Sequence, residues 1–136
     1  MPSPQTITVV IHSWQEEHNI QDVIENARQL SPDVIVIDMQ STDKTVSIAK
    51  KMGVPVFDFK YMRYVEPARN FGLAQASGDW VFILDADERL TPALISEVQL
   101  AVTNPQYTYY RVPRVEVFNK KDYLRHGGWQ SAPQVR

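Results

Sequence analysis

The stretch "WVFILDADERL" (residues 80–90) joins an apolar run to a group of acids. Residues 80–84 have the composition of a buried strand, and Asp85 and Asp87 follow at once with a single alanine between them. In open α/β sheets, ligands bind beyond the carboxyl ends of the strands. The stretch therefore predicts a sheet protein that holds two carboxylates at a ligand-binding edge.

Apolar runs and amphipathic segments alternate along the rest of the chain. Apolar residues that recur every three or four positions predict a helix, and continuous apolar runs predict a buried strand. The predicted strands are 6–13, 34–38, 54–59 and 80–84, and the predicted helices are 16–30, 43–52, 66–77 and 92–102. This alternation favours an α/β fold with a doubly wound, mostly parallel sheet.

Local signals set expectations for the helix ends and for the C-terminal region. Ser41 or Thr42 is expected to cap the helix at 43–52, which Gly53 is expected to end. Thr91 is expected to cap the helix at 92–102. Segments 107–118 and 123–129 are aromatic and β-branched and flank "NKKD", which predicts an antiparallel hairpin.

Composition narrows the class of protein. The chain has 136 residues, 43% of them hydrophobic, which fits one domain over 1–136. A formal net charge of −2 gives no electrostatic case for nucleic acid, and the lack of cysteine fits a reducing compartment. No apolar run approaches a spanning helix. We expect a cytoplasmic protein, with attachment at the inner face of the plasma membrane through another chain left open.

Asp85 and Asp87 are the sharpest chemical signal. Two carboxylates so placed can turn toward one point and hold a hard divalent ion, Mg²⁺ or Mn²⁺, whose other ligands are water and a substrate diphosphate. The alternative is an acidic loop between a strand and a helix. A haloacid-type phosphatase motif is disfavoured, because Glu88 and Arg89 stand where Gly-Thr or Gly-Val would follow. A dinucleotide-binding fold is rejected, because no G-x-G-x-x-G follows the first strand.

Four motifs, "VVIHSWQEEHNI", "VIVIDMQSTDKTVSIAKKMG", "ARNFGLAQASGDWVFILDADERL" and "HGGW", resemble in this order the GT-A-fold glycosyltransferases of family 2. Within this family, the sequence "LDADER" (residues 84–89) resembles the branch of the lipopolysaccharide core sugar transferases. The resemblance covers about residues 6–129. It implies an inverting transfer of sugar, in cell-envelope or lipopolysaccharide synthesis, from a nucleotide-diphospho-sugar to a hydroxyl of a glycan or lipid-linked glycan. A UDP-sugar donor is favoured, and a divalent metal (Mn²⁺ or Mg²⁺) is the implied cofactor.

The resemblance also implies roles for single residues. Asp85 and Asp87 would hold the metal, with Asp85 also near the ribose. Glu16 would lie close to the nucleoside, Asp38 would match the first acid after the second strand, and Arg69 would face the donor phosphates. Two positions depart from the family pattern: Met39 stands where many members have a second acid, and Gln15 replaces the usual Asn.

The general base of the family lies beyond the metal motif, so we assign no catalytic residue and expect the base outside this chain. Glu116 and Asp122 are better interpreted as surface residues of the predicted hairpin. The ending "GGWQSAPQVR" lacks a capping element, so we expect a domain cut at its C-terminus, without the acceptor-side half. Two further hypotheses stay open: a catalytically incomplete fragment that binds a nucleotide-sugar, and self-association into a homo-oligomer.

Overall fold

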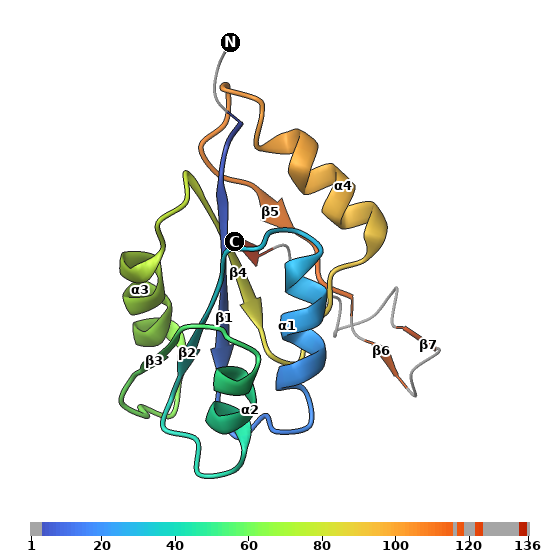
Figure 1. Cartoon of the computed structure of the whole chain (residues 1–136). Helices are drawn as coiled ribbons and strands as arrows, with labels where there is room; N and C mark the ends of the chain where they lie inside the picture. The colour runs from blue at the N-terminus through green and yellow to red at the C-terminus, as the bar shows by residue number, and fades with distance from the viewer. Residues whose placement is uncertain (1–3, 116, 119–121, 124–133, 136) are drawn as a thin grey trace. The chain divides into compact units, whose positions relative to one another are not determined.

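The computed structural model describes residues 4–115, 117–118, 122–123 and 134–135. The chain divides into two compact units, residues 1–104 and 105–136, and each is described by itself. In the first unit, strands and helices alternate throughout (Figure 1). In chain order they are β1 (Ile7–Ser13), α1 (Ile20–Arg28), β2 (Val34–Asp38), α2 (Thr45–Lys51), β3 (Val56–Asp58), α3 (Glu66–Gln75), β4 (Trp80–Asp85) and α4 (Pro92–Ala101).

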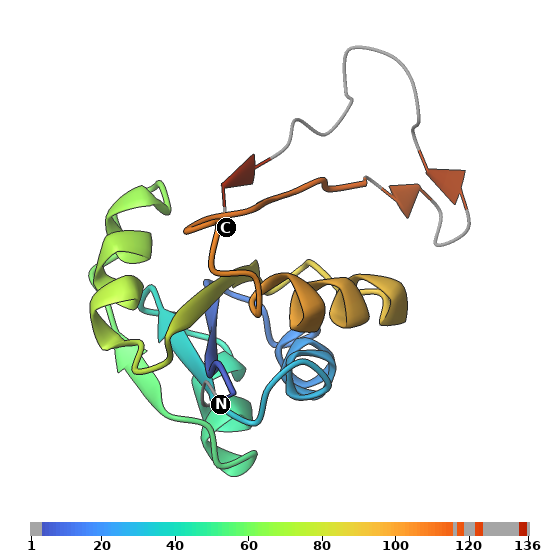
Figure 2. The ribbon, with the colours of Figure 1, turned by 90° about the horizontal axis from the view of Figure 1, so that it is seen from above.

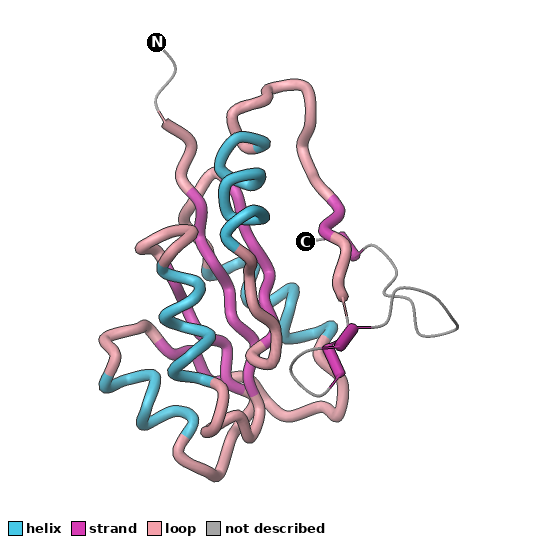
Figure 3. The backbone as a smooth tube through the Cα atoms, turned by 90° about the vertical axis from the view of Figure 1, so that its right-hand side faces the viewer, coloured by secondary structure: helices cyan, strands magenta, loops and turns pink. Residues whose placement is uncertain are grey.

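The four strands form one parallel sheet in the order β3-β2-β1-β4. Figure 3 shows the strands in magenta and the helices in cyan. The first two crossovers step in one direction along the sheet and the third steps back past β1. Because such crossovers are right-handed, α1 and α2 lie on one face of the sheet and α3 on the other. Figure 2 shows α3 on one side of the sheet and α1 with α4 on the other. The doubly wound parallel sheet is therefore confirmed.

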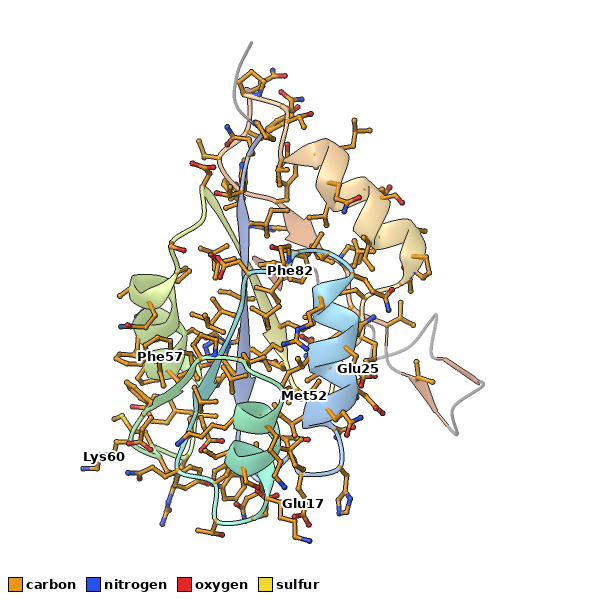
Figure 4. The ribbon with its side chains drawn as sticks, in the orientation of Figure 1. Glu17, Glu25, Met52, Phe57, Lys60 and Phe82 are labelled. Atoms are coloured by element: carbon orange, nitrogen blue, oxygen red, sulfur yellow. The ribbon has the colours of Figure 1, made fainter. Side chains whose placement is uncertain are left out.

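Every residue of β1 and β2 is buried, which explains their largely apolar sequences. On the α3 face, Val10, Ile35 and Ile37 pack with Ala68 of the helix. Phe57, which is labelled in Figure 4, adds an edge contact to Phe71, with ring centroids 6.5 Å apart. Sandwiched between helices, the central strands can present polar groups only at their ends.

Four predicted helix ends can be compared with the structure. The first helix begins at Ile20 rather than at 16, because the Glu16 carbonyl accepts from the N–H groups of Asn19 and Ile20 in a turn. The predicted cap of α2 is wrong: its N-cap is Lys44, and neither Ser41 nor Thr42 caps it. Ser41 instead hydrogen-bonds to Gln15 and Asp38, and Thr42 hydrogen-bonds to Gln15.

The other two predicted ends are confirmed. Gly53 follows α2 with a φ of +74°, the left-handed conformation that glycine adopts without strain. The Thr91 hydroxyl accepts from the Leu94 N–H at 3.1 Å and so caps α4. Within the part of the chain that the structure describes, no helix is both long enough and apolar enough to cross a membrane.

The second unit contains two short antiparallel pairs. Strand β5 (Arg111–Val112) pairs with β8 (Gln134–Val135), and β6 (Val117–Phe118) pairs with β7 (Asp122–Tyr123). The β6–β7 pair confirms a hairpin around "NKKD". Residues 124–129 of the predicted second strand lie outside the described residues, as does Glu116.

Candidate functional site at the carboxyl edge of the sheet

The turn that follows β4 holds Asp85 and Asp87. The Asp85 N–H donates to the Glu88 carboxylate at 2.9 Å, and the Glu88 N–H donates back to the Asp85 carbonyl at 2.9 Å. Between them, the Ala86 N–H donates to the His12 carbonyl at 3.1 Å, so the turn stays attached to β1. Ala86 is buried and Asp87 is exposed. This closed turn presents the Asp87 carboxylate to solvent.

Arg69, in the first turn of α3, reaches across to the end of β4. Its Nη2 donates to Asp85 Oδ1 at 3.2 Å and to Oδ2 at 3.1 Å. Both side chains are partly buried, with 21% of Arg69 and 24% of Asp85 exposed. The structure thus brings together two of the residues expected to meet the donor, and it pairs them with each other.

Asp38, at the end of β2, occupies a different environment. It is 1% exposed and accepts hydrogen bonds from the Ser13 hydroxyl at 2.9 Å, the Ser41 N–H at 2.8 Å and the Ser41 hydroxyl at 2.7 Å. These donors come from the ends of both β1 and β2. Asp38 therefore holds the loop after β2 against β1, and protein donors surround its carboxylate.

The strand register places the predicted acids at one edge but on two faces. Asp85 is level with His12 and Asp38 with Ser13, so the two acids flank β1 one residue apart. Two strand spacings separate their backbones by about 10 Å. Successive side chains alternate between faces, so Asp85 faces α3 and Asp38 faces α1 and α2. Their hydrogen-bond partners agree with this assignment.

Glu16 belongs to the network around the β1 and β2 loops. Its backbone N–H donates to the Thr45 hydroxyl at 2.8 Å, and its carboxylate accepts from the Asn19 side chain at 2.8 Å. Nearby, burial raises the pKa of Asp43, but hydrogen bonds from the Thr45 hydroxyl and N–H and from the Glu17 N–H outweigh it and hold that pKa below its ordinary value. Glu17, labelled in Figure 4, also accepts from the Lys44 N–H.

Gln15 joins the two loops, a role that the sequence did not reveal. Its side-chain oxygen accepts from the Thr42 N–H at 2.6 Å, and its own N–H donates to the Ser41 hydroxyl at 2.8 Å. Gln15 does so with a φ of +56°, a conformation that few non-glycine residues adopt. A departure from the family pattern at this position was the signal that could have identified it.

An exposed aromatic pair lies beside these loops. Trp14 stacks on Tyr61, with ring centroids 4.7 Å apart and planes at 21°. Trp14 is 43% exposed and Tyr61 38% exposed. The Tyr61 N–H donates to the Gln40 side chain at 3.3 Å, which places the β3–α3 loop next to the end of β2. The carboxyl edge therefore offers a flat aromatic surface as well as acids.

A divalent ion fits the β4 turn on the chemistry of its donors. Among the described residues, no three His, Asp or Glu side chains converge into a metal-holding group. Mg²⁺ and Mn²⁺ need few protein carboxylates when water and substrate phosphates complete the octahedron. Asp85 and Asp87 can supply the protein oxygens, with Asp87 as the more accessible one.

Comparison with known proteins identifies the family of this chain. The model of glycosyl transferase family 2 matches residues 8–134. An uncharacterised glycosyltransferase of Rickettsia prowazekii is 31% identical over 111 residues, which cover 82% of this chain and 38% of that protein. One from Rickettsia typhi is 36% identical over 68% of this chain and 32% of its own length. The chain thus spans about a third of the length of these relatives.

Solved structures agree on the GT-A fold. Glucosyl-3-phosphoglycerate synthase of Mycobacterium tuberculosis, solved with Mn²⁺ and UDP-glucose, is 31% identical over 61% of this chain and 33% of its own, with a TM-score of 0.55. A mannosyltransferase of Pyrobaculum calidifontis, solved with GDP-mannose and Mn²⁺, has a TM-score of 0.68 at 24% identity and covers 82% of this chain and 36% of its own. With its parallel sheet, its acidic β4 turn and a family match over residues 8–134, the chain belongs to glycosyl transferase family 2.

Proposed function

We propose that this chain forms the donor-binding part of an enzyme that transfers a sugar from a nucleotide-diphospho-sugar to an acceptor hydroxyl. The observation that carries the proposal is the β4 turn, where Asp85 and Asp87 lie with Arg69 at the carboxyl edge of a parallel sheet. Carboxylates for a metal and a guanidinium for phosphates are the two groups that a metal-bound diphosphate requires.

The proposed roles follow from accessibility. Asp87 is exposed and would contact the ion directly, and Asp85, which pairs with Arg69 in the structure, would supply the second carboxylate. When bound, the ion supplies neutralisation of the negative charge that grows on the departing diphosphate. Glu16 would lie near the nucleoside. Asp38, buried among hydroxyl and N–H donors, would act on the donor by holding the loops that surround it.

UDP is the favoured nucleotide. Glucosyl-3-phosphoglycerate synthase, a relative at 31% identity, has been solved with UDP together with Mn²⁺ or Mg²⁺. The Trp14 ring, beside the loops of β1 and β2, would provide a stacking surface for the base. The Mn²⁺ or Mg²⁺ requirement of this chain is proposed on the same grounds.

The rest of the reaction is proposed from the "LDADER" resemblance. It comprises inverting transfer to a glycan or lipid-linked glycan in cell-envelope or lipopolysaccharide synthesis. From the composition we also propose a cytoplasmic location, with attachment at the inner face of the plasma membrane left open. We assign no general base. Because the chain spans about a third of the length of its relatives, donor binding is the step that can be tested with this chain alone.

The test is thermal unfolding of the chain with UDP or GDP, each with and without Mn²⁺. A ligand at about a hundred times its dissociation constant adds about 2.7 kcal/mol to the free energy of unfolding, which raises the midpoint by several degrees. We expect a rise with UDP that requires Mn²⁺ and that Asp87→Ala abolishes. If neither nucleotide shifts the midpoint with Mn²⁺ present, the donor site is refuted.

A further inference from the structure

The pair between Arg69 and Asp85 is an unusual form of an arginine–carboxylate contact. The strong form uses two nitrogens of the guanidinium fork, one for each oxygen. Here Nη2 alone contacts both oxygens, at 3.2 and 3.1 Å. The Nε of Arg69 is buried and has no hydrogen-bond partner among the described residues.

This geometry leaves Arg69 short of its best arrangement. A buried N–H without a partner destabilises the folded state by more than a partly exposed ion pair usually stabilises it. The contact with Asp85 is therefore weak enough to be exchanged for another. A diphosphate, which offers several anionic oxygens to one guanidinium, is a better partner for the same side chain.

Arg69 also affects a cation at the β4 turn directly. A guanidinium within 3.2 Å of the Asp85 oxygens neutralises much of the negative charge that would attract a divalent ion. It repels that ion as well, because both carry positive charge. A diphosphate changes this, because its negative charge attracts both the ion and Arg69 and so offsets the repulsion between them.

We infer that Arg69 and a divalent ion are alternative partners of Asp85, so that Arg69 suppresses binding of the free ion and makes it depend on the diphosphate. This inference rests on the proposed function and adds a regulation of the same site. When the ion binds with a nucleotide diphosphate, Arg69 leaves Asp85 and pairs with the phosphates. By linkage, UDP then raises the affinity for the ion by the factor by which the ion raises the affinity for UDP.

The experiment compares the wild-type chain with Arg69→Gln, in which the charge is removed and a shorter, neutral amide side chain remains. Titration calorimetry gives the dissociation constants of Mn²⁺ alone, of UDP alone and of UDP with saturating Mn²⁺. Electron paramagnetic resonance of free Mn²⁺ checks the first value. We expect Arg69→Gln to bind Mn²⁺ alone about threefold to fivefold more tightly, the upper range of an ion-pair effect, and to bind UDP with Mn²⁺ about tenfold more weakly.

Lys51→Gln is the matched control. It removes the same charge from an exposed position in the last turn of α2, at the opposite edge of the sheet. All three constants should stay within about twofold of wild type, because surface charges farther apart than a Debye length are screened. A change in Lys51→Gln equal to that in Arg69→Gln would show an effect of net charge and overturn the inference.

The two proposals fail in different ways. If the wild-type chain binds no UDP with Mn²⁺, the donor site itself is refuted. If it does bind, and Arg69→Gln binds Mn²⁺ alone no more tightly than wild type, only the exchange of partners is refuted. Should Arg69→Gln not fold, Arg69→Lys carries the test, because lysine is shorter than arginine, has a single nitrogen and therefore weakens the contact with Asp85. Its affinity for Mn²⁺ alone should rise by about twofold to threefold, and no rise would contradict the inference.

Discussion

Asp38 and Asp85 flank β1 at its carboxyl end and face opposite sides of the sheet. Asp38 is enclosed by donors of the chain itself, whereas Asp85 lies beside the exposed Asp87. Acids that look equivalent in the sequence therefore have different consequences when they are removed.

Asp38→Ala should lower the free energy of unfolding by about 2 to 4 kcal/mol, because it leaves the Ser13 and Ser41 donors without an acceptor in a buried place. Asp87→Ala, at an exposed position, should change it by no more than about 0.5 kcal/mol. Urea denaturation of both variants checks the contrast. Equal stability of the two would contradict the structural role of Asp38.

Gln15 allows the left-handed backbone to be separated from the hydrogen bonds of the side chain. Gln15→Ala and Gln15→Gly both lose the amide that accepts from Thr42, but only glycine adopts a φ of +56° without strain. Gln15→Gly should therefore be the more stable of the two by about 1 kcal/mol, although glycine usually destabilises relative to alanine. Denaturation midpoints give the comparison, and the usual order would show that the loop does not need this conformation.

Two glycines should tolerate a methyl group to different degrees. A Cβ on Gly72 would lie 2.8 Å from Val10 Cγ1, a side-chain atom, whereas on Gly78 it would lie 2.7 Å from the Thr8 backbone nitrogen. Side chains can shift and backbone in a buried strand cannot, so Gly78→Ala should cost more than Gly72→Ala. We expect about 1 to 3 kcal/mol for Gly72→Ala, measured by thermal or urea unfolding. The reverse order would mean that α3 is held more rigidly than β1.

Asp79 should contribute to the acid sensitivity of the fold. Hydrogen bonds from the backbone N–H and the hydroxyl of Thr6 hold the pKa of Asp79 below its ordinary value of 3.8. A carboxylate with a lowered pKa stabilises the folded state above pH 3.8 and loses that contribution as the pH falls through the lowered value. Asp79→Asn should therefore be less stable than wild type at pH 6, and the gap should close below about pH 4. Unfolding measured across this range would contradict the assignment if the gap stayed constant.

The sheet could be predicted from the sequence because its central strands are largely apolar. Strand β2 matches its predicted bounds at both ends, and β4 extends one residue beyond them. The start of α1 was predicted wrongly because Glu16 closes a turn onto Asn19 and Ile20. The cap of α2 was predicted wrongly because Ser41 and Thr42 bond to Asp38 and Gln15 rather than to the helix. Contacts between loops that are far apart in the sequence leave no local periodicity to detect.

The candidate site, like the fold, could be predicted only in part from the sequence. Asp85 and Asp87 could be located from their place after a buried strand, and their common edge with Asp38 followed from parallel topology. The opposite faces of Asp38 and Asp85 depend on the register of β1 with its two neighbours. The pairing of Arg69 with Asp85 depends on how closely α3 approaches β1, and Gly72 permits that approach.

The turn after β4 is closed by its own chain, through the reciprocal bonds between Asp85 and Glu88 and the attachment of Ala86 to β1. Ordering a backbone residue costs roughly 1 to 2 kcal/mol of conformational entropy. In this turn the backbone is already ordered in the folded protein. An ion that arrives at Asp85 and Asp87 therefore has little backbone to immobilise. Its affinity should be governed by charge and dehydration, and calorimetry should record only a small conformational contribution to the binding entropy.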